Sequence, residues 1–454
     1  MIFEYVSRTE GASRLILIFA GWAMDSRPFS DLRFGEYDIA VVYDYRHFDF
    51  PADLSNYSEI VVIAWSFGVV GAEYFLASNP GLPITATIAI NGTPEAVDDR
   101  KGIPSGIFEA TLDALTPASL TKFYRRTAGK NFRQFLTRLP QRDFNGLADE
   151  LKAVRTACGR KGVRWDKAIV GANDLIIPAE NQRHSWEGHT AEIIGDNIDH
   201  LPDFPRLFSR HLTDKRLVAT RFSRAVGSYD DSADVQRQIA RKIADALPSS
   251  VPTDIDIIEI GCGSGYSTRL LLKRYPDAHL KLADIHSWPD ICGHAVEQTD
   301  GEIWMRSVPS ESADMIYSVS AVQWFNSLPA FLRQCSRVLR PGGSLVLTTF
   351  GTETMKQLRT IGAATRHYPS AEFISGLLKG EGWSDISVTT EEIVRRFDTP
   401  KDLLAHLRQT GVNAISSASP TADALAIMRS YPFDPDGRIS LTYQPVYITA
   451  TWPK

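Results

Sequence analysis

Cysteine is scarce in this sequence, and long apolar runs and an apolar leader are missing. The four cysteines (Cys158, Cys262, Cys292 and Cys335) form no C-x-x-C pair, which argues against a disulfide framework and a thiolate zinc site, so we expect no metal. The sequence has no run of about 18 uncharged apolar residues, so we expect no transmembrane helix. The first residues, MIFEYVSRTEG, lack the basic start and apolar core of a signal peptide. We therefore expect a cytoplasmic protein with no membrane partner.

Charge is spread unevenly along the chain. The 454 residues are 43% hydrophobic and 23% charged, which is ordinary for two or three globular domains and excludes a disordered chain, a collagen-like fibre and a simple coiled coil. The net charge is −5, yet residues 100–164 hold fourteen Lys/Arg and only five Asp/Glu. This basic segment indicates either an acidic partner, which we do not expect to be nucleic acid, or a solvated helical face.

The apolar runs form two series, which predicts two α/β domains. In the first series, buried parallel strands are expected at 14–20, 38–44, 59–65, 84–90 and 167–171. The basic stretch, at about 100–165, reads as a helical cap inserted between two strands. In the second series, strands are expected at 255–260, 279–285, 314–319, 344–349, 384–390 and 438–451. We predict domains at 1–213 and 214–454.

A buried strand ends at Ala64-Trp65-Ser66-Phe67-Gly68, and a helix of small residues follows. This is the arrangement of a nucleophile elbow, in which the residues two before and two after the serine must be small because the turn is sharp. Chance strand–helix turns also produce such a pattern. Whether the pattern indicates a catalytic serine therefore depends on the order in which possible partners follow it in the chain.

Candidate partners follow Ser66 in the α/β-hydrolase order, acid and then histidine. Asp174 comes just after the strand at 167–171, and His200 lies in a loop after a short strand. His200 would take the proton of Ser66, and Asp174 would orient the imidazole. A strand also runs into Ala20-Gly21-Trp22, so the backbone N–H groups of Trp22 and Phe67 are candidates for an oxyanion hole.

These stretches resemble one family over residues 1 to about 212. The segments FAGWAMD, VVYDYR, VIAWSFGVVGA, AINGTP, GANDLIIPAENQ and DHLPDF are similar to those of BioG-type pimeloyl-ACP methyl ester esterases of biotin synthesis. The resemblance implies an α/β-hydrolase fold and an acyl carrier protein (ACP) as partner. ACP is small and strongly acidic, so the basic cap would dock it. From their clustering, the candidate docking residues are Arg125, Arg126, Arg133, Arg138 and Arg142.

A glycine-rich loop follows the first strand of the second series. The residues are Glu259-Ile260-Gly261-Cys262-Gly263-Ser264-Gly265, and a helix begins next. A dinucleotide site would have glycine where Tyr266 stands. The spacing G-x-G-x-G, with an acid before it, suits S-adenosylmethionine (SAM) instead and is similar to motif I of class I methyltransferases, which have a Rossmann-like fold. Asp284, at the end of the next strand, would accept the ribose hydroxyls, and Asp300 is a candidate near the adenine, or a simple loop aspartate.

The finer resemblance of residues 218–454 is to BioC-type malonyl-ACP O-methyltransferases. It rests on RFSRAVGSYDDSADVQRQIA, SVSAVQWFNSL, SRVLRPGGSLVLTTF, LLAHLRQTGVNA and LTYQPVYITA. A malonyl carboxylate is ionised at pH 7 and needs no general base, so the enzyme must mainly position and desolvate it. Candidate cations for this carboxylate are Arg221, Arg224 and Arg306. Candidate pocket residues are Tyr229, Gln323 and Trp324, although core packing explains the last two equally well.

Together the two halves predict a bifunctional enzyme of biotin synthesis. The second domain would methylate malonyl-ACP with SAM, and the first would hydrolyse pimeloyl-ACP methyl ester through a Ser-His-Asp triad. The alternative is a carboxylesterase fused to a methyltransferase for a different small acid or carrier-bound substrate. A non-catalytic hydrolase-like module in the first half is a further alternative.

Overall fold

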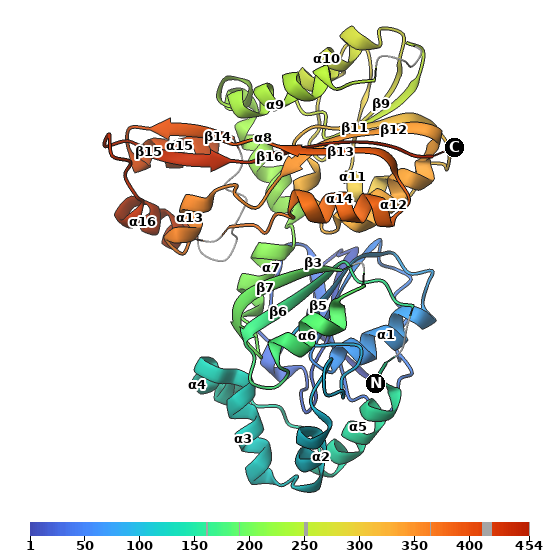
Figure 1. The fold of residues 1–454 in the computed structure, drawn as a ribbon, viewed down its shortest axis with the longest axis vertical. Coiled ribbons are helices and arrows are strands. Elements are labelled where there is room, and N and C mark those ends of the chain that lie inside the picture. The colour runs from blue at the N-terminus through green and yellow to red at the C-terminus, as the bar shows by residue number, and fades with distance from the viewer. Residues whose placement is uncertain (160–161, 190, 249–252, 364, 411–419, 454) are drawn as a thin grey trace. The chain divides into compact units, whose positions relative to one another are not determined.

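Residues 1–159, 162–189, 191–248, 253–363, 365–410 and 420–453 are described in the structure, a computed structural model. The chain divides into two compact units, Met1–Pro205 and Arg206–Lys454, each with its own large sheet (Figure 1). The division falls inside α7 (Phe204–His211), whereas the sequence predicts a boundary between residues 213 and 214. No helix in the described residues is long and apolar enough to cross a membrane.

The first unit is built on a seven-stranded sheet with the order β1-β3-β2-β4-β5-β6-β7. Its strands are β1 (Ile2–Ser7), β2 (Arg14–Phe19), β3 (Tyr37–Tyr43), β4 (Glu59–Trp65), β5 (Ile84–Ile90), β6 (Lys167–Asn173) and β7 (Glu192–Asp199). From β3 to β7 all neighbours are parallel, and β3 and β4 are buried along their whole length, as continuous apolar runs require. The carboxyl ends of these strands therefore meet at one edge of the sheet.

Strand β1 was not expected from the sequence. It pairs antiparallel with β3 at the edge of the sheet, and most of its residues are exposed or half-buried. Its mixed sequence, IFEYVS, lacks the continuous apolar run that indicates a buried parallel strand.

Helices α1 (Gly68–Ser78) and α6 (Ala179–Trp186) belong to the same unit, and between β5 and β6 the chain forms the helical cap (residues 100–165). The cap helices are α2 (Ser105–Asp113), α3 (Pro117–Ala128), α4 (Phe132–Phe135) and α5 (Phe144–Ala157). A capping box between Thr116 and Ser119 starts α3, and the Asp143 side chain caps α5. The cap is helical, as the sequence predicts.

The second unit holds a seven-stranded sheet with the order β10-β9-β8-β11-β12-β16-β13, and a two-stranded sheet of β14 and β15. The strands are β8 (Asp256–Ile260), β9 (His279–Asp284), β10 (Val296–Gln298), β11 (Ala313–Ser318), β12 (Leu339–Phe350), β13 (Ser384–Thr390), β14 (Ile393–Phe397), β15 (Ile439–Tyr443) and β16 (Pro445–Thr451). Strand β8 lies between β9 and β11, where the direction of the crossovers reverses. In open α/β sheets, ligands bind at the carboxyl edge of such a point.

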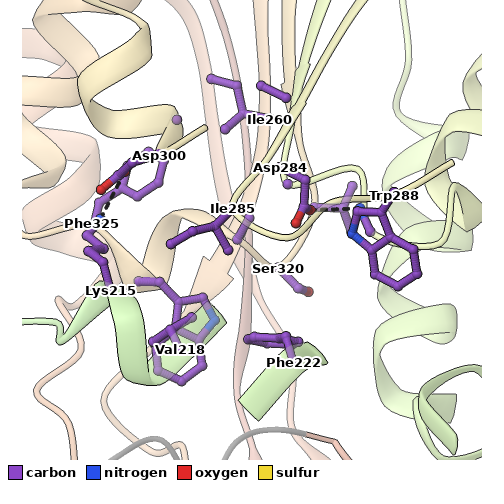
Figure 2. A pocket seen from close by; sticks show the side chains of 17 residues that line it. Lys215, Val218, Phe222, Ile260, Asp284, Ile285, Trp288, Asp300, Ser320 and Phe325 are labelled. Atoms are coloured by element: carbon purple, nitrogen blue, oxygen red, sulfur yellow. Dashed lines mark hydrogen bonds and ion pairs between the residues drawn. The ribbon is translucent and has the colours of Figure 1, made fainter. Parts of the chain in front are cut away.

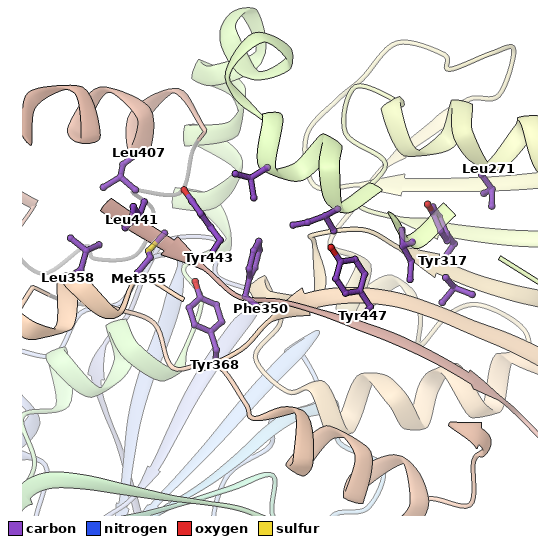
Figure 3. Close-up of a cluster of buried hydrophobic side chains, with 14 of the residues drawn as sticks. Leu271, Tyr317, Phe350, Met355, Leu358, Tyr368, Leu407, Leu441, Tyr443 and Tyr447 are labelled. Atoms are coloured by element: carbon purple, nitrogen blue, oxygen red, sulfur yellow. The ribbon is translucent and has the colours of Figure 1, made fainter. Parts of the chain in front are cut away.

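The predicted single strand at 438–451 is two strands. Gln444 separates them: its N–H donates to Thr354 Oγ1 (3.0 Å) and its carbonyl accepts from Gly351 N–H (2.8 Å). Strand β15 pairs with β14, and β16 joins the large sheet antiparallel to β12 and β13. The side chains of Tyr443 and Tyr447 then share one apolar core with Phe350 and Tyr317 (Figure 3).

The helices of the second unit are α8 (Lys215–Ser232), α9 (Asp234–Asp245), α10 (Tyr266–Arg274), α11 (Gly301–Trp304), α12 (Leu328–Val338), α13 (Lys356–Thr360), α14 (Ala371–Gly380), α15 (Pro400–Gln409) and α16 (Pro420–Ser430). Buried apolar side chains of α9, α10 and α15 belong to the core drawn in Figure 3, and those of α12 and α14 to a second core. The two cores hold the sheet in place, so that the loops after β8 and β9 have a fixed support.

Candidate functional sites

Ser66 occupies a strained turn directly after β4. Its φ is 58°, in the left-handed region that a side-chain-bearing residue rarely adopts. A Cβ at Gly68 would lie 2.1 Å from the carbonyl oxygen of Phe19, so that only glycine fits there. The turn thus has the geometry of a nucleophile elbow, in which the serine hydroxyl stands at the carboxyl edge of the sheet.

Three side chains meet at this edge in a hydrogen-bonded chain. His200 Nε2 lies 3.0 Å from Ser66 Oγ, and His200 Nδ1 lies 2.9 Å from each carboxylate oxygen of Asp174. The side chains of His200 and Asp174 are 1% and 0% exposed, so water does not compete for these bonds. The arrangement is suited to proton transfer from Ser66 to His200.

Asp174 accepts hydrogen bonds from partners that the sequence did not indicate. Gln182 on α6 is fully buried, and its Nε2 donates to Asp174 Oδ2 at 2.8 Å. The backbone N–H groups of Ile176 and Ile177 donate to Asp174 Oδ1 at 2.8 and 3.0 Å. No sequence signal singled out Gln182, because its role depends on how α6 packs beside β6.

A cavity of about 490 Å³ opens at Ser66 and is lined by Trp22, Phe67 and apolar side chains that include Phe108 and Phe123. Trp22 and Phe67 are each 3% exposed. Within the described residues, no hydrogen bond uses the peptide N–H of either residue. Two buried donors that lack acceptors beside a serine hydroxyl are what an oxyanion hole requires, and the apolar walls suit an acyl chain.

The five arginines expected to dock ACP do not share one environment, and the prediction is wrong for Arg142. Its side chain is 7% exposed, and Nη2 lies 3.2 Å from Asp44 Oδ2 and 3.1 Å from Glu150 Oε2. A buried guanidinium between two carboxylates is a structural group that no docking partner can reach.

The other four arginines are differently placed. Arg138 pairs with Asp31, and Arg126 lines the Ser66 cavity and donates to the Leu175 carbonyl at 2.6 Å. Arg125, whose guanidinium lies over the Phe132 ring, and Arg133 are exposed. Arg126 is exposed as well, so these three arginines remain candidates for a surface contact.

The second unit has a cavity of about 810 Å³ beside the carboxyl end of β8 (Figure 2). Of the predicted cofactor residues, Gly261, Gly263, Asp284 and Asp300 line it. Gly265 precedes α10 as its N-cap residue, and Glu259 lies fully buried in β8. In the described residues, no group of three or more His, Cys, Asp or Glu is placed to hold a metal ion.

The residues of this cavity fit SAM. Gly263 has a φ of 54°, and no atom lies within 4 Å of the place where its Cβ would stand, so the loop leaves open room for a ligand. Its N–H donates to Asp284 Oδ2 at 3.0 Å. Glu259 Oε1 accepts from the Ser267 hydroxyl at 2.6 Å, whereas the buried Oε2 has no partner among the described residues. Asp284 on the cavity wall, and the orphaned oxygen of Glu259 one residue before the lining residue Ile260, match a ligand with cationic groups and hydroxyls.

Burial raises the pKa values of both acids. Desolvation raises the pKa of Glu259 to about 7, although the hydrogen bond from the Ser267 hydroxyl opposes it. The pKa of Asp284 is also raised by burial, against hydrogen bonds from the N–H groups of His286 and Gly263. A bound cation would lower both pKa values, so the site gains charge complementarity when it is filled.

Asp300 has a charged partner that the sequence did not indicate. Lys215 Nζ, at the start of α8, lies 3.3 Å from Asp300 Oδ1 and 2.9 Å from Glu302 Oε2, and its side chain is 3% exposed. Asp300 also caps α11, accepting from the N–H of Glu302 at 3.1 Å. Figure 2 shows this pair on the far side of the cavity from Asp284 and Trp288, which places Asp300 on the cavity wall.

A neighbouring cavity of about 380 Å³ shares Phe222, Ser320 and Trp324 with the first and is also lined by Gln323. Gln323 Nε2 donates to the Ser320 carbonyl at 2.5 Å. In the described residues, neither cavity is lined by the predicted cations Arg221, Arg224 and Arg306. Tyr229 lies on α8, but its side chain is outside the described part of the structure.

Comparison with known proteins finds a separate family match for each half of the chain. Residues 3–211 match the family described as pimeloyl-ACP methyl esterase BioG, and residues 232–415 match a methyltransferase domain family. A malonyl-[acyl-carrier protein] O-methyltransferase of Bacteroides fragilis is 37% identical, over 96% of this chain and 92% of that protein. The protein of the same name from Bacteroides thetaiotaomicron is 33% identical, over 52% of this chain and 97% of its own length. A crystal structure of BioG from Haemophilus influenzae is 31% identical and covers 44% of this chain and 94% of that chain, with a TM-score of 0.41.

The second unit is therefore a Rossmann-like methyltransferase domain that takes SAM as its cofactor. The match to the Bacteroides fragilis protein runs through both units, and the two family matches divide the chain between them. The chain belongs to the malonyl-[acyl-carrier protein] O-methyltransferase family of biotin synthesis, as a fusion of an N-terminal BioG-type domain with a C-terminal SAM-dependent methyltransferase domain.

Proposed function

We propose that this chain carries out two reactions on acyl groups attached to ACP. The C-terminal domain methylates the free carboxylate of malonyl-ACP, and the N-terminal domain hydrolyses pimeloyl-ACP methyl ester to pimeloyl-ACP and methanol. The observation that carries the proposal is the Ser66–His200–Asp174 chain, with its 3.0 and 2.9 Å contacts, inside a domain of the BioG family. The names of the relatives support the substrate of the C-terminal domain.

In the ester hydrolysis that we propose, Ser66 Oγ attacks the ester carbonyl while His200 Nε2 takes its proton. Asp174 holds the other nitrogen of His200 and stabilises the imidazolium. The N–H groups of Trp22 and Phe67 donate to the oxyanion. Methanol leaves with the proton from His200, and water then releases the acid from Ser66 by the same steps. The apolar cavity at Ser66 holds the acyl chain of the substrate.

Methyl transfer demands less of the protein. SAM supplies an electrophilic methyl group on a sulfonium, and the malonyl carboxylate is already ionised at neutral pH. Glu259, Gly263 and Asp284 would bind the cofactor, and Phe222 and Trp324, shared by the two cavities, would separate it from the acceptor. The enzyme thereby excludes water and aligns the reacting groups. Assays with malonyl-ACP and with free malonate test whether the carrier is required.

The two activities serve one purpose at different times. Desolvating a carboxylate costs several kcal/mol or more, so a methyl ester lets an apolar elongation pocket accept the end of the chain. Once the chain reaches pimeloyl length, the ester must be removed. The esterase domain must therefore discriminate against the short malonyl ester that the other domain makes.

Reversing the charges of Arg125 and Arg133 to glutamate is expected to raise the KM for the ACP-bound ester and to leave a short free methyl ester nearly unaffected. Both side chains are exposed on the cap, and ACP is acidic. Exposed charges act over a Debye length that falls from about 30 Å at 0.01 M salt to about 10 Å at 0.1 M. The parent rate on the ACP ester should therefore fall across this range of salt.

The matched control reverses Arg8 and Arg27, which are exposed in the same unit but outside the cap, and should leave the KM for the ACP ester unchanged. If the variant of Arg125 and Arg133 hydrolyses the ACP ester as well as the parent at low salt, these residues do not dock ACP. The triad proposal is independent of that result.

Affinity for SAM is expected to rise by up to about tenfold between pH 6 and pH 8. The pKa of Glu259 is raised to about 7, so this acid is mostly neutral at pH 6 and mostly charged at pH 8. A cationic ligand binds the charged form better, and below pH 7 a proton must first be released. Calorimetry of the parent and of Glu259→Gln measures this; the variant should bind more weakly and lose the pH dependence. Equal slopes in the two proteins would exclude Glu259 as the titrating group.

A further inference from the structure

Asn91 is a buried polar residue that the catalytic steps above do not use. It follows β5 in the segment AINGTP and is 1% exposed. Its φ is 45°, in the left-handed region, where asparagine is one of the better tolerated side chains. A buried amide held in this conformation needs partners for its donors and its acceptor.

The partners of Asn91 are backbone groups beside the triad. Its Nδ2 donates to the carbonyl oxygens of Asp199 and His200, both at 2.9 Å. Its Oδ1 accepts from the N–H of Gly171 at 2.7 Å. Gly171 lies in β6 shortly before Asp174, whose N–H donates to the Gly171 carbonyl at 3.3 Å. One side chain thus joins the segment of the histidine to the segment of the acid.

The segment that contains Ser66 is hydrogen-bonded to the same part of the structure, through Ile90 and His200. The N–H of Ser66 donates to the carbonyl of Ile90, the residue before Asn91, at 3.0 Å. Trp65, directly before Ser66, donates its indole Nε1–H to the His200 carbonyl at 2.7 Å, and its ring lies 5.5 Å from the imidazole. The His200 carbonyl is therefore fixed by two donors, one from Trp65 and one from Asn91.

We propose that Asn91 is a positioning residue for the Ser66–His200–Asp174 triad, an inference that rests on the proposed esterase function. It fixes the backbone of His200 relative to β6, so that the imidazole reaches Ser66 Oγ and Asp174 together. It touches no substrate and acts only through His200 and Asp174. A misplacement of about 1 Å at a reacting group costs on the order of 10²-fold in rate.

The first test is Asn91→Gly, which removes the side chain and tolerates the positive φ. We expect kcat for ester hydrolysis to fall about 10- to 100-fold with KM unchanged, because the acyl pocket is intact and the triad is misaligned. The matched control is Asn79→Gly, which removes an amide that donates to the Phe75 carbonyl at 2.8 Å after α1, away from the triad. The control should keep the parent kcat.

The second test is Asn91→Asp, which keeps the size and the acceptor for Gly171 N–H but replaces the donors to Asp199 and His200 by an oxygen. We expect a comparable loss of kcat, because the carboxylate oxygen would face two carbonyl oxygens. If Asn91 only fills space, this isosteric variant would keep the parent kcat. If the glycine variant does not fold, the aspartate variant alone tests the positioning role.

The rate at which a fluorophosphonate labels Ser66 distinguishes the two proposals. If the parent is labelled but does not hydrolyse pimeloyl-ACP methyl ester, the proposed substrate is wrong, and slower labelling of both Asn91 variants would still support the positioning role. If either folded variant is labelled and hydrolyses ester at the parent rate, the positioning role is overturned, whatever the substrate.

Discussion

Replacing Ser66 with alanine is expected to lower ester hydrolysis by about 10⁶-fold and to leave methyl transfer at the parent rate. Loss of a triad nucleophile removes covalent catalysis, and the other members of such a triad contribute little without it. The Ser66 hydroxyl is the only one of the triad groups that would bond to the substrate carbon. The SAM cavity belongs to the other unit, so its residues are unchanged.

Both activities are measured on one preparation of the Ser66→Ala protein, with Ser58→Ala as the control. Ser58 carries a hydroxyl in the same unit that donates to the Ser13 carbonyl and lies outside the cavity at Ser66. The control should retain hydrolysis and fluorophosphonate labelling. Substantial ester hydrolysis by Ser66→Ala, or an equal loss of methyl transfer in a folded protein, would contradict the separation of the two sites.

Replacing Gly263 with valine is expected to weaken SAM binding on the order of 100-fold and to spare the esterase. The Cβ of residue 263 would project into open space of the cavity, where the cofactor fits, and overpacking of this kind costs about 1–3 kcal/mol. A β-branched residue is also strained at a φ of 54°, which would disturb the N–H bond to Asp284. Together, the filled space and the backbone strain predict the loss of SAM affinity.

Gly437→Val is the matched control, because Gly437 also has a positive φ (80°) with open space around it but lies in the turn before β15. It shares the backbone strain and lacks the contact with the cavity. Calorimetry should give parent affinity for the control and greatly weakened binding for Gly263→Val. Equal affinities in the two variants would remove Gly263 from the cofactor site. Asp284→Ala should also weaken binding, because it removes the carboxylate that would accept the ribose hydroxyls.

Much of the fold follows from local patterns in the sequence. Runs such as EIVVIAW and IDIIEI predict buried parallel strands because both faces of the strand must be apolar, and β4 and β8 lie there. The half-exposed β1 and the short β14 carry no such run and were missed. The break between β15 and β16 was missed too, because it depends on contacts of Gln444 with residues far away in the chain.

The residues of the candidate sites likewise divide into those that local patterns indicate and those whose role depends on tertiary contacts. Ser66, Asp174 and His200 could be predicted because each follows a recognisable strand end, and strand ends meet at one edge. The burial of Arg142 could not be predicted, because Asp44, one of its two partners, belongs to a distant strand end. Asn91 and Gln182 could not be predicted either, since a polar residue gains such a role only when the tertiary fold brings backbone groups to it.

The central claim, two opposed reactions on carrier-bound chains by one protein, is tested most directly by mass spectrometry of ACP species. Malonyl-ACP and pimeloyl-ACP methyl ester are incubated separately with the enzyme and SAM. We predict a gain of one methylene mass (about 14 Da) on malonyl-ACP, which depends on SAM, and a loss of the same mass from the pimeloyl ester, which depends on Ser66. An unchanged mass for either species, with folded enzyme, would contradict the corresponding half of the claim.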